Sequence, residues 1–159
     1  MTIPEVITMK SDINDCITAY KQQLAVGDIR IAYEFLIKYV MTLKAAFEKS
    51  YAAKYPSGNV SPGYMDFTYF PFFDTYLREK KLRFGIILNH EKMRFELWLM
   101  GQNAEVQKKY WNLLKIAKWN ENQTAMPKYS VLEAVLVGNP NFDNLEAVFC
   151  LLNGGSFVF

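Results

Sequence analysis

The chain has 159 residues, of which 51% are hydrophobic and 21% are charged, and its formal net charge is +2. This composition excludes an intrinsically disordered chain, and the length matches one ordinary globular domain. The small charge imbalance gives no argument for nucleic acid, because phosphate binding normally needs a clustered basic face. We therefore expect one domain over residues 1–159 and no nucleic-acid partner.

The sequence offers no targeting or membrane signal. The N-terminal segment MTIPEVITMK lacks the apolar core of a secretory signal, and no stretch approaches the ~18 consecutive apolar residues of a membrane span. Cys16 and Cys150 fall in predicted helices among apolar neighbours, which favours two reduced, buried thiols over a disulfide. We expect a cytoplasmic protein with no membrane partner.

Two helices are predicted in the first third of the chain. Asp12 is a suitable N-cap for a helix that ends near Val26, where Gly27 can take the left-handed position after the helix. Asp28 begins a longer helix whose apolar residues recur every three or four positions. It should end near Tyr55, because the prolines and glycine of PSGNVSP interrupt the pattern.

After this loop the apolar pattern alternates with a period of two. An aromatic-rich strand is predicted from Tyr64 to Phe70, with Pro71 as its end. The segment 72–81 fits either a short helix or a loop. The segments 82–89 and 92–100 are predicted to form a hairpin that turns at His90 and Glu91.

The hairpin can be checked by its own pairing. Folding the two segments about His90 and Glu91 brings apolar residues opposite each other on one face of the sheet. The pairs are Leu88 with Met93, Ile86 with Phe95, and Phe84 with Leu97. A slip of one residue would destroy this agreement, since it moves every side chain to the other face.

A third helix is predicted from Asn103 to Lys118, followed by a polar loop over 119–128. A fourth strand over 129–137 is dense in Val and Leu, which favours a central place in the sheet. Asp143 caps a last helix that runs to about Leu152. The whole order predicts an α+β fold with two N-terminal helices, a mainly antiparallel sheet of about four strands, and two further helices packed on it.

The common catalytic templates do not fit this sequence. His90 is the single histidine, so a two-histidine metal motif cannot form, and a Ser-His-Asp triad would have to use a residue at a hairpin turn. Neither glycine-rich phosphate motif, GxxxxGK[ST] or GxGxxG, occurs. We therefore expect no metal and no cofactor, and we favour a protein without catalytic activity.

The opposite face of the predicted hairpin is polar and aromatic. The predicted register places Arg83 across from Trp98, within reach of a cation–π contact, and Gly85 across from Glu96, with space above the glycine. If the aromatic strand lies alongside, its polar residues join this face. The candidate ligand-binding residues are Tyr64, Asp66, Arg83, Arg94, Glu96 and Trp98.

Two interpretations of this face stay open. Arginines suit an anionic group and aromatic rings suit a planar one, so the face could bind a small anionic or aromatic ligand. A solvated sheet face with cross-strand ion pairs would show the same alternation. A tryptophan on a solvent-exposed face would favour the first interpretation or a protein partner, because either would bury the indole ring.

The segments GYMDFTYFPFF (Gly63 to Phe73) and KLRFGIILNHEKMRFELWLMGQNAEVQKKYW (Lys81 to Trp111) resemble an uncharacterised family of small bacterial proteins, a domain of unknown function. The resemblance is strongest over YMD and RFELWLMG, and it extends over the N-terminal helices and the PNFD turn. It implies a bacterial, intracellular protein of one domain. It supplies no activity and no site residues.

Two functions follow as hypotheses. The first is a non-catalytic binding or protein-interaction domain, able to form a homo-oligomer in which a partner covers Trp98 and the apolar end Phe157–Phe159. The second is a small-molecule-binding protein or an enzyme that uses the candidate ligand-binding residues. We favour the first, because no catalytic motif accompanies the surplus of aromatic residues.

Overall fold

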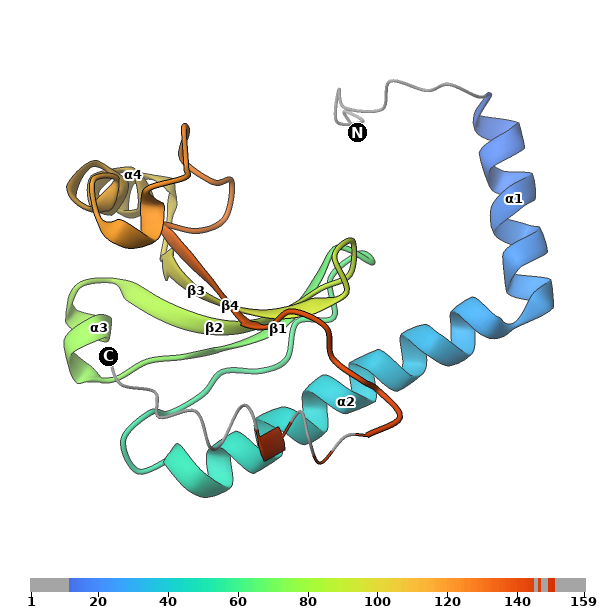
Figure 1. Ribbon diagram of the computed structural model, residues 1–159, viewed down its shortest axis with the longest axis horizontal. Helices are drawn as coiled ribbons and strands as arrows, with labels where there is room; N and C mark the ends of the chain where they lie inside the picture. The colour runs from blue at the N-terminus through green and yellow to red at the C-terminus, as the bar shows by residue number, and fades with distance from the viewer. Residues whose placement is uncertain (1–11, 145, 147–148, 151–159) are drawn as a thin grey trace. The chain divides into compact units, whose positions relative to one another are not determined.

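The computed structural model describes residues 12–144, 146 and 149–150. These residues form an α+β fold with a four-stranded antiparallel sheet, as predicted (Figure 1). The order of the strands, which the sequence did not predict, is β1-β2-β3-β4. The elements are α1 (Ile13–Val26), α2 (Asp28–Tyr51), β1 (Phe67–Phe72), α3 (Thr75–Glu79), β2 (Leu82–Asn89), β3 (Arg94–Gly101), α4 (Ala104–Leu114), the 3₁₀ turn η1 (Lys118–Asn120) and β4 (Leu132–Val137). Half of the predicted last helix, 143–152, lies outside the described residues.

The chain divides into an N-terminal unit that ends at Leu36 and a C-terminal unit that begins at Ile37, with α2 contributing to both. In the N-terminal unit α1 has the predicted ends. Asp12 accepts a hydrogen bond from the backbone N–H of Asn14 at 3.3 Å, and Gly27 follows the helix with a φ of 95°. The prediction for α2 was four residues too long, since it ends at Tyr51.

The prediction of buried cysteines was wrong. Cys16 and Cys150 are both exposed. Cys16 is exposed because α1, despite its apolar stripe, has no buried residue. None of the helices in the described part of the chain is long and apolar enough to cross a membrane.

β2 and β3 form the predicted hairpin in a register shifted by two residues. Leu88 lies opposite Phe95, Ile86 opposite Leu97, and Phe84 opposite Leu99. The turn spans residues 90–93, because the side chain of Asn89 accepts a hydrogen bond from Lys92 N–H at 3.1 Å and Met93 takes a left-handed φ of 46°. Met93 therefore belongs to the turn and not to the apolar face, where the predicted register had put it.

A shift of two residues preserves the side on which each side chain points. Within β2 and β3 each side chain therefore points to the predicted side, but the cross-strand neighbours differ. Arg83 lies opposite Met100 rather than Trp98, and Gly85 lies opposite Trp98 rather than Glu96. The side predicted for β1 was wrong, because its aromatic residues Phe67 and Tyr69, and not the polar Thr68, lie on the side of Ile87 and Trp98. We call the side of the sheet that carries Arg83, Ile87, Glu96, Trp98 and Met100 the cleft face.

β1 is an edge strand that continues through Pro71, where we had predicted its end. The carbonyl of Pro71 accepts a hydrogen bond from Gly58 N–H at 2.8 Å on the outer side of the strand. The proline nitrogen faces that same side, so no hydrogen bond to β2 is lost. Bridges from Ser57 to Phe72 and from Ser61 to Tyr69 tie the preceding loop along this edge.

β4 is the opposite edge strand and not a central one. Its first residue, Leu132, packs against a buried cluster of Leu77, Leu82 and Leu99, whereas Ala134 and Val135 are exposed. One-sided packing therefore explains the apolar composition that had suggested a central strand.

The apolar face of the sheet packs against the C-terminal half of α2. The ring of Phe47 lies 5.6 Å from that of Phe70 and 4.8 Å from that of Phe72, and Tyr39 lies 5.7 Å from Phe95, measured between centroids. The contacts of α2 thus lie on the side of the sheet opposite to the cleft face.

α4 packs at the end of the sheet, where its Val106, Tyr110 and Leu114 contact the cluster around Leu99. Gly101, the last residue of β3, permits the close approach. A Cβ at this position would lie 2.7 Å from the backbone nitrogen of Gln107 and 3.0 Å from its Cα. Because those atoms belong to the backbone of α4, the helix itself would have to move.

We expect Gly101→Ala to lower the free energy of unfolding by about 1–3 kcal/mol, the usual cost of overpacking. Urea denaturation measures this change. Gly138→Ala is the matched control, because a Cβ there meets only Val135 Cγ1 at 3.9 Å. Its effect should stay within about 0.5 kcal/mol. Equal effects of the two substitutions would contradict the close contact between Gly101 and α4.

Candidate functional site

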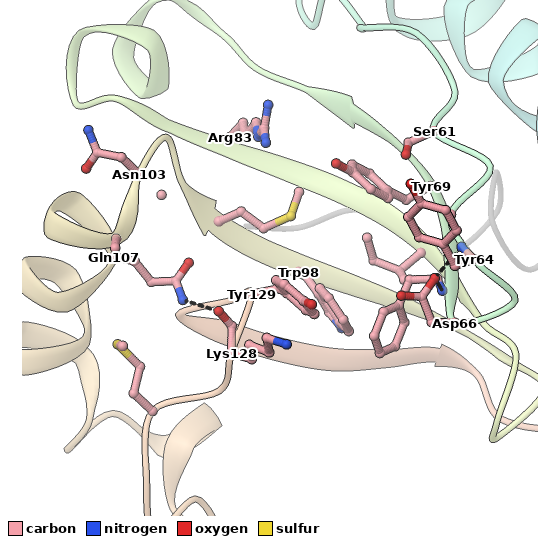
Figure 2. Close-up of a pocket in the computed structure, with 17 residues that line it drawn as sticks. Ser61, Tyr64, Asp66, Tyr69, Arg83, Trp98, Asn103, Gln107, Lys128 and Tyr129 are labelled. Carbon is pink, nitrogen blue, oxygen red and sulfur yellow. Dashed lines mark hydrogen bonds between the residues drawn. The ribbon is translucent and has the colours of Figure 1, made fainter. Parts of the chain in front are cut away.

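The cleft face of the sheet carries a cleft of about 500 Å³. This volume falls within the range of about 300–1,000 Å³ that small-molecule sites occupy. The loop before β1, with Tyr64 and Asp66, forms one wall (Figure 2). The start of α4 and the loop before β4, with Gln107 and Lys128, form the other, and Trp98 lies between the two walls.

The floor of the cleft is apolar and mostly aromatic. Ile87, Trp98 and Met100 are buried in one cluster, with Phe67 and Tyr69 packed against it. The rings of Phe67 and Trp98 meet edge to face with centroids 4.8 Å apart.

The space that we predicted above Gly85 is filled. A Cβ at Gly85 would lie 2.6 Å from the terminal methyl of Met100 and 3.0 Å from Ile87 Cδ1. The glycine thus lets the floor pack closely, and the cavity lies above these side chains instead of at the glycine.

Glu96 holds Trp98 in place from within the sheet. Its carboxylate is 2% exposed and accepts three hydrogen bonds. Oε2 accepts from Trp98 Nε1 at 2.8 Å, and Oε1 accepts from Arg94 Nε at 2.6 Å and from Asn89 Nδ2 at 3.2 Å. A buried carboxylate needs such partners, because burial without them costs several kcal/mol. The indole N–H is therefore directed at Glu96 and not into the cleft.

Asp66 provides a fixed negative charge on the first wall. Its Oδ1 accepts hydrogen bonds from the backbone N–H groups of Tyr64 at 2.8 Å and Phe67 at 2.7 Å. Partial burial raises the pKa of the Asp66 carboxyl, but these backbone hydrogen bonds outweigh it and hold the pKa below its ordinary value. Asp66 is therefore ionised at neutral pH.

His90 has a structural role behind the same wall. Its backbone N–H donates to the Asp66 carbonyl at 2.9 Å, and its Nε2 lies 2.8 Å from Thr68 Oγ1. Because that hydroxyl donates to the Pro62 carbonyl at 2.7 Å, it accepts from His90, which places the proton on Nε2. Burial lowers the pKa of His90, although the charge of Asp66 acts in the opposite direction. A neutral imidazole thus ties the wall to the hairpin turn.

The second wall depends on Gln107 of α4, which is buried. Its Nε2 donates to the carbonyls of Pro127 at 3.2 Å and Lys128 at 3.1 Å, which holds the loop before β4 beside the floor. Tyr129, from this loop, meets Phe67 edge to face at 6.2 Å. Gln107, Lys128 and Tyr129 were not among the residues predicted from the sequence. The sequence contains one indication of this wall, a glutamine next to Val106 on the side of the predicted helix that faces the sheet.

Four of the six candidate residues line the cleft, namely Tyr64, Asp66, Arg83 and Trp98. Arg94 and Glu96 do not, although they lie on the same side of the sheet, because they pair with each other at the hairpin end of β3. Trp98 is 5% exposed and covered by its own chain, so it needs no partner subunit as cover. The other expected contact of such a partner, Phe157–Phe159, lies outside the described residues.

Arg83 lies at the far end of the cleft from Asp66. Phe67 pairs with Asn89, six residues along β2 from Arg83, which is about 20 Å along an extended strand. Arg83 Nε is buried and has no hydrogen-bond partner in the described part of the chain. Over residues 12–144, 146 and 149–150, no three His, Cys, Asp or Glu side chains gather closely enough to hold a metal ion.

We expect Glu96→Gln to lower the free energy of unfolding by about 2–3 kcal/mol, measured by urea denaturation. The amide keeps the shape of the side chain, but its NH₂ group replaces one of the two acceptor oxygens. A donor then faces a donor, and at least one buried hydrogen bond is lost. Glu91→Gln, at the exposed hairpin turn, is the charge-matched control and should change stability by less than about 0.5 kcal/mol. A Glu96→Gln protein as stable as this control would contradict the clamp on Trp98.

No curated protein and no solved structure shows a significant match to the chain. One family model matches residues 13–154, which include both walls and the floor of the cleft. The family is described as a domain of unknown function, so it supplies no activity, ligand or site residue to compare with the cleft. The chain belongs to this family, the domain of unknown function DUF7000.

Proposed function

We propose that this protein binds a small molecule in the cleft, with a planar ring against the aromatic floor and an anionic group toward Arg83. The observation that carries the proposal is the cleft itself, a concavity of about 500 Å³ with an aromatic floor and fixed charges of opposite sign at its two ends. The proposal assigns binding alone, without a bond-breaking step.

The clamp on Trp98 supports a planar ligand. With its N–H committed to Glu96, the indole offers the cleft only apolar ring surface. Tyr129 stands beside the floor and is about half exposed, so its ring can cover one side of a bound ring. Aromatic pairs of this kind contribute about 0.5–1.5 kcal/mol beyond the burial of their area.

Arg83 supports an anionic group at one end. A buried donor without an acceptor costs about 1–3 kcal/mol, and more when it is charged. An anionic acceptor beside Arg83 Nε removes that cost and forms a charge-assisted hydrogen bond. Lys128, also in the cleft lining, adds a second positive charge.

We further propose a bacterial, cytoplasmic setting for this binding protein. The low cysteine content, two residues in 159, fits a reducing compartment, in which disulfides are rare.

Titration with a panel of aromatic carboxylates, from benzoate to 2-naphthoate, tests the binding site. The chain has three tryptophans, Trp98, Trp111 and Trp119, whose indole N–H signals can be followed separately by NMR after assignment by substitution. We expect a saturable shift of the Trp98 signal, because a ring on the floor changes its surroundings. The signal of Trp119, which is 68% exposed and outside the cleft, should stay in place.

Tyr129→Ala should weaken binding of the carboxylates about fivefold, the loss of one aromatic contact. Tyr20→Ala is the matched control, because Tyr20 is an exposed tyrosine of α1 and does not line the cleft. No saturable shift at Trp98, or a shift at Trp119 alone, would overturn the proposed function.

A further inference from the structure

A second hollow of about 320 Å³ lies at the corner where α3 leads into β2. Three cationic side chains line it, Arg78, Lys81 and Arg83, which we call the basic notch. Its other lining residues are Phe73, Leu82 and Gln102, so the lining contains no carboxylate. Arg83 lines both this hollow and the aromatic cleft.

The cations of the basic notch form no ion pair among the described residues, although Lys81 also lines a neighbouring hollow with Glu79 and Glu105. Ion pairs in the described part of the chain join Lys44 with Glu48 and Arg94 with Glu96, and both lie outside the notch. Asp74, close by in sequence, is the N-cap of α3 and accepts a hydrogen bond from Leu77 N–H at 2.8 Å.

Two members of the notch have further features that fit a site for an anion. Arg78 lies over the ring of Phe73 at 5.2 Å, a contact that orients the guanidinium without neutralising its charge. Arg83 Nε is buried without a hydrogen-bond partner among the described residues.

The backbone at Lys81 is strained. Its φ is 58°, in the left-handed region that glycine and asparagine occupy at lower cost. Hydrogen bonds from Lys81 N–H to the Arg78 carbonyl at 3.0 Å and from Gln102 N–H to the Lys81 carbonyl at 2.9 Å hold this conformation. Such strain occurs preferentially at ligand sites, and here it lies at a residue that lines the basic notch.

We propose that the basic notch binds a phosphate group, and that this phosphate belongs to the same ligand whose planar ring lies in the aromatic cleft. The ligand class is then an aromatic or heterocyclic phosphate monoester. The inference rests on the proposed function, and Arg83 connects the two hollows. A phosphate group fits the notch better than a carboxylate, because it carries nearly two negative charges at neutral pH and offers three acceptor oxygens to three separate cations.

Isothermal titration calorimetry at constant ionic strength, with inorganic phosphate and with phenyl phosphate, tests this inference. We expect saturable binding of both, with phenyl phosphate about tenfold tighter because its ring reaches the aromatic floor. Lys81→Asn and Arg78→Gln should each weaken both ligands about tenfold, the loss of one charge-assisted hydrogen bond. Tyr129→Ala should weaken phenyl phosphate alone.

Lys81→Asn is the most informative variant, because asparagine tolerates the left-handed backbone while the charge is removed. The Tm of the unliganded variant should stay equal or rise by about 2–4 °C, which excludes misfolding as the cause of weaker binding. Lys92→Gln, in the hairpin turn, removes the same charge outside both hollows and should leave both affinities unchanged.

The phosphate site in the basic notch and the ring site in the aromatic cleft can be disproved separately. Saturable binding of the aromatic carboxylates without any binding of phosphate would overturn the basic notch and leave the aromatic cleft intact. An equal loss for Lys92→Gln and Lys81→Asn would also overturn it, since the effect would be general charge attraction. Equal affinities for the two phosphates, both insensitive to Tyr129→Ala, would overturn the assignment of ring and phosphate to one ligand.

Discussion

The hydrogen bond from the Trp98 indole to the buried Glu96 carboxylate determines what the cleft face of the sheet can do. Charge is expensive to bury, so Glu96 is tolerated at 2% exposure only because Trp98, Arg94 and Asn89 all donate to it. The same bonds remove Arg94 and Glu96 from the cleft and turn the polar edge of Trp98 inward. What remains at the floor is rigid aromatic surface, which suits a planar ligand better than an open, solvated sheet would.

The walls depend on polar side chains that satisfy the backbone of loops. Gln107 holds the loop before β4 through two carbonyls, and Thr68, with His90 behind it, holds the loop before β1 through the Pro62 carbonyl. Loops are ordinarily the mobile parts of a domain, and here each is fixed to a helix or strand by a buried polar group. The cleft is therefore preformed, with its floor fixed by Glu96 and its walls fixed by Gln107 and Thr68. A preformed site binds its ligand without a large loss of conformational entropy in the protein.

Much of the sheet was predictable, because successive side chains of a β-strand point to opposite faces whatever residue lies across from them. The predicted hairpin register was wrong by two residues, yet Arg83 and Trp98 stayed on the cleft face, since a shift of two leaves each side chain on its side. The pairing itself depended on Asn89, whose side chain closes a longer turn than the residue types alone indicated. Tyr129 and Gln107 were missed because strand order and the path of a polar loop are set by tertiary contacts. The basic notch was missed although Arg78, Lys81 and Arg83 fall within six residues of the sequence, because only the path of the backbone from α3 into β2 shows that they line one hollow.

Hydrogen exchange of the three indole N–H groups tests the central claim most directly, because it needs neither a ligand nor a substitution that could alter the fold. If Glu96 clamps Trp98, the Trp98 indole proton should exchange as slowly as the backbone amides at the centre of β3, through rare opening of the sheet. The indole proton of Trp119, which is 68% exposed, should exchange at the rate of a free indole. Exchange of Trp98 as fast as that of Trp119 would contradict a fixed aromatic floor, and with it the proposed site.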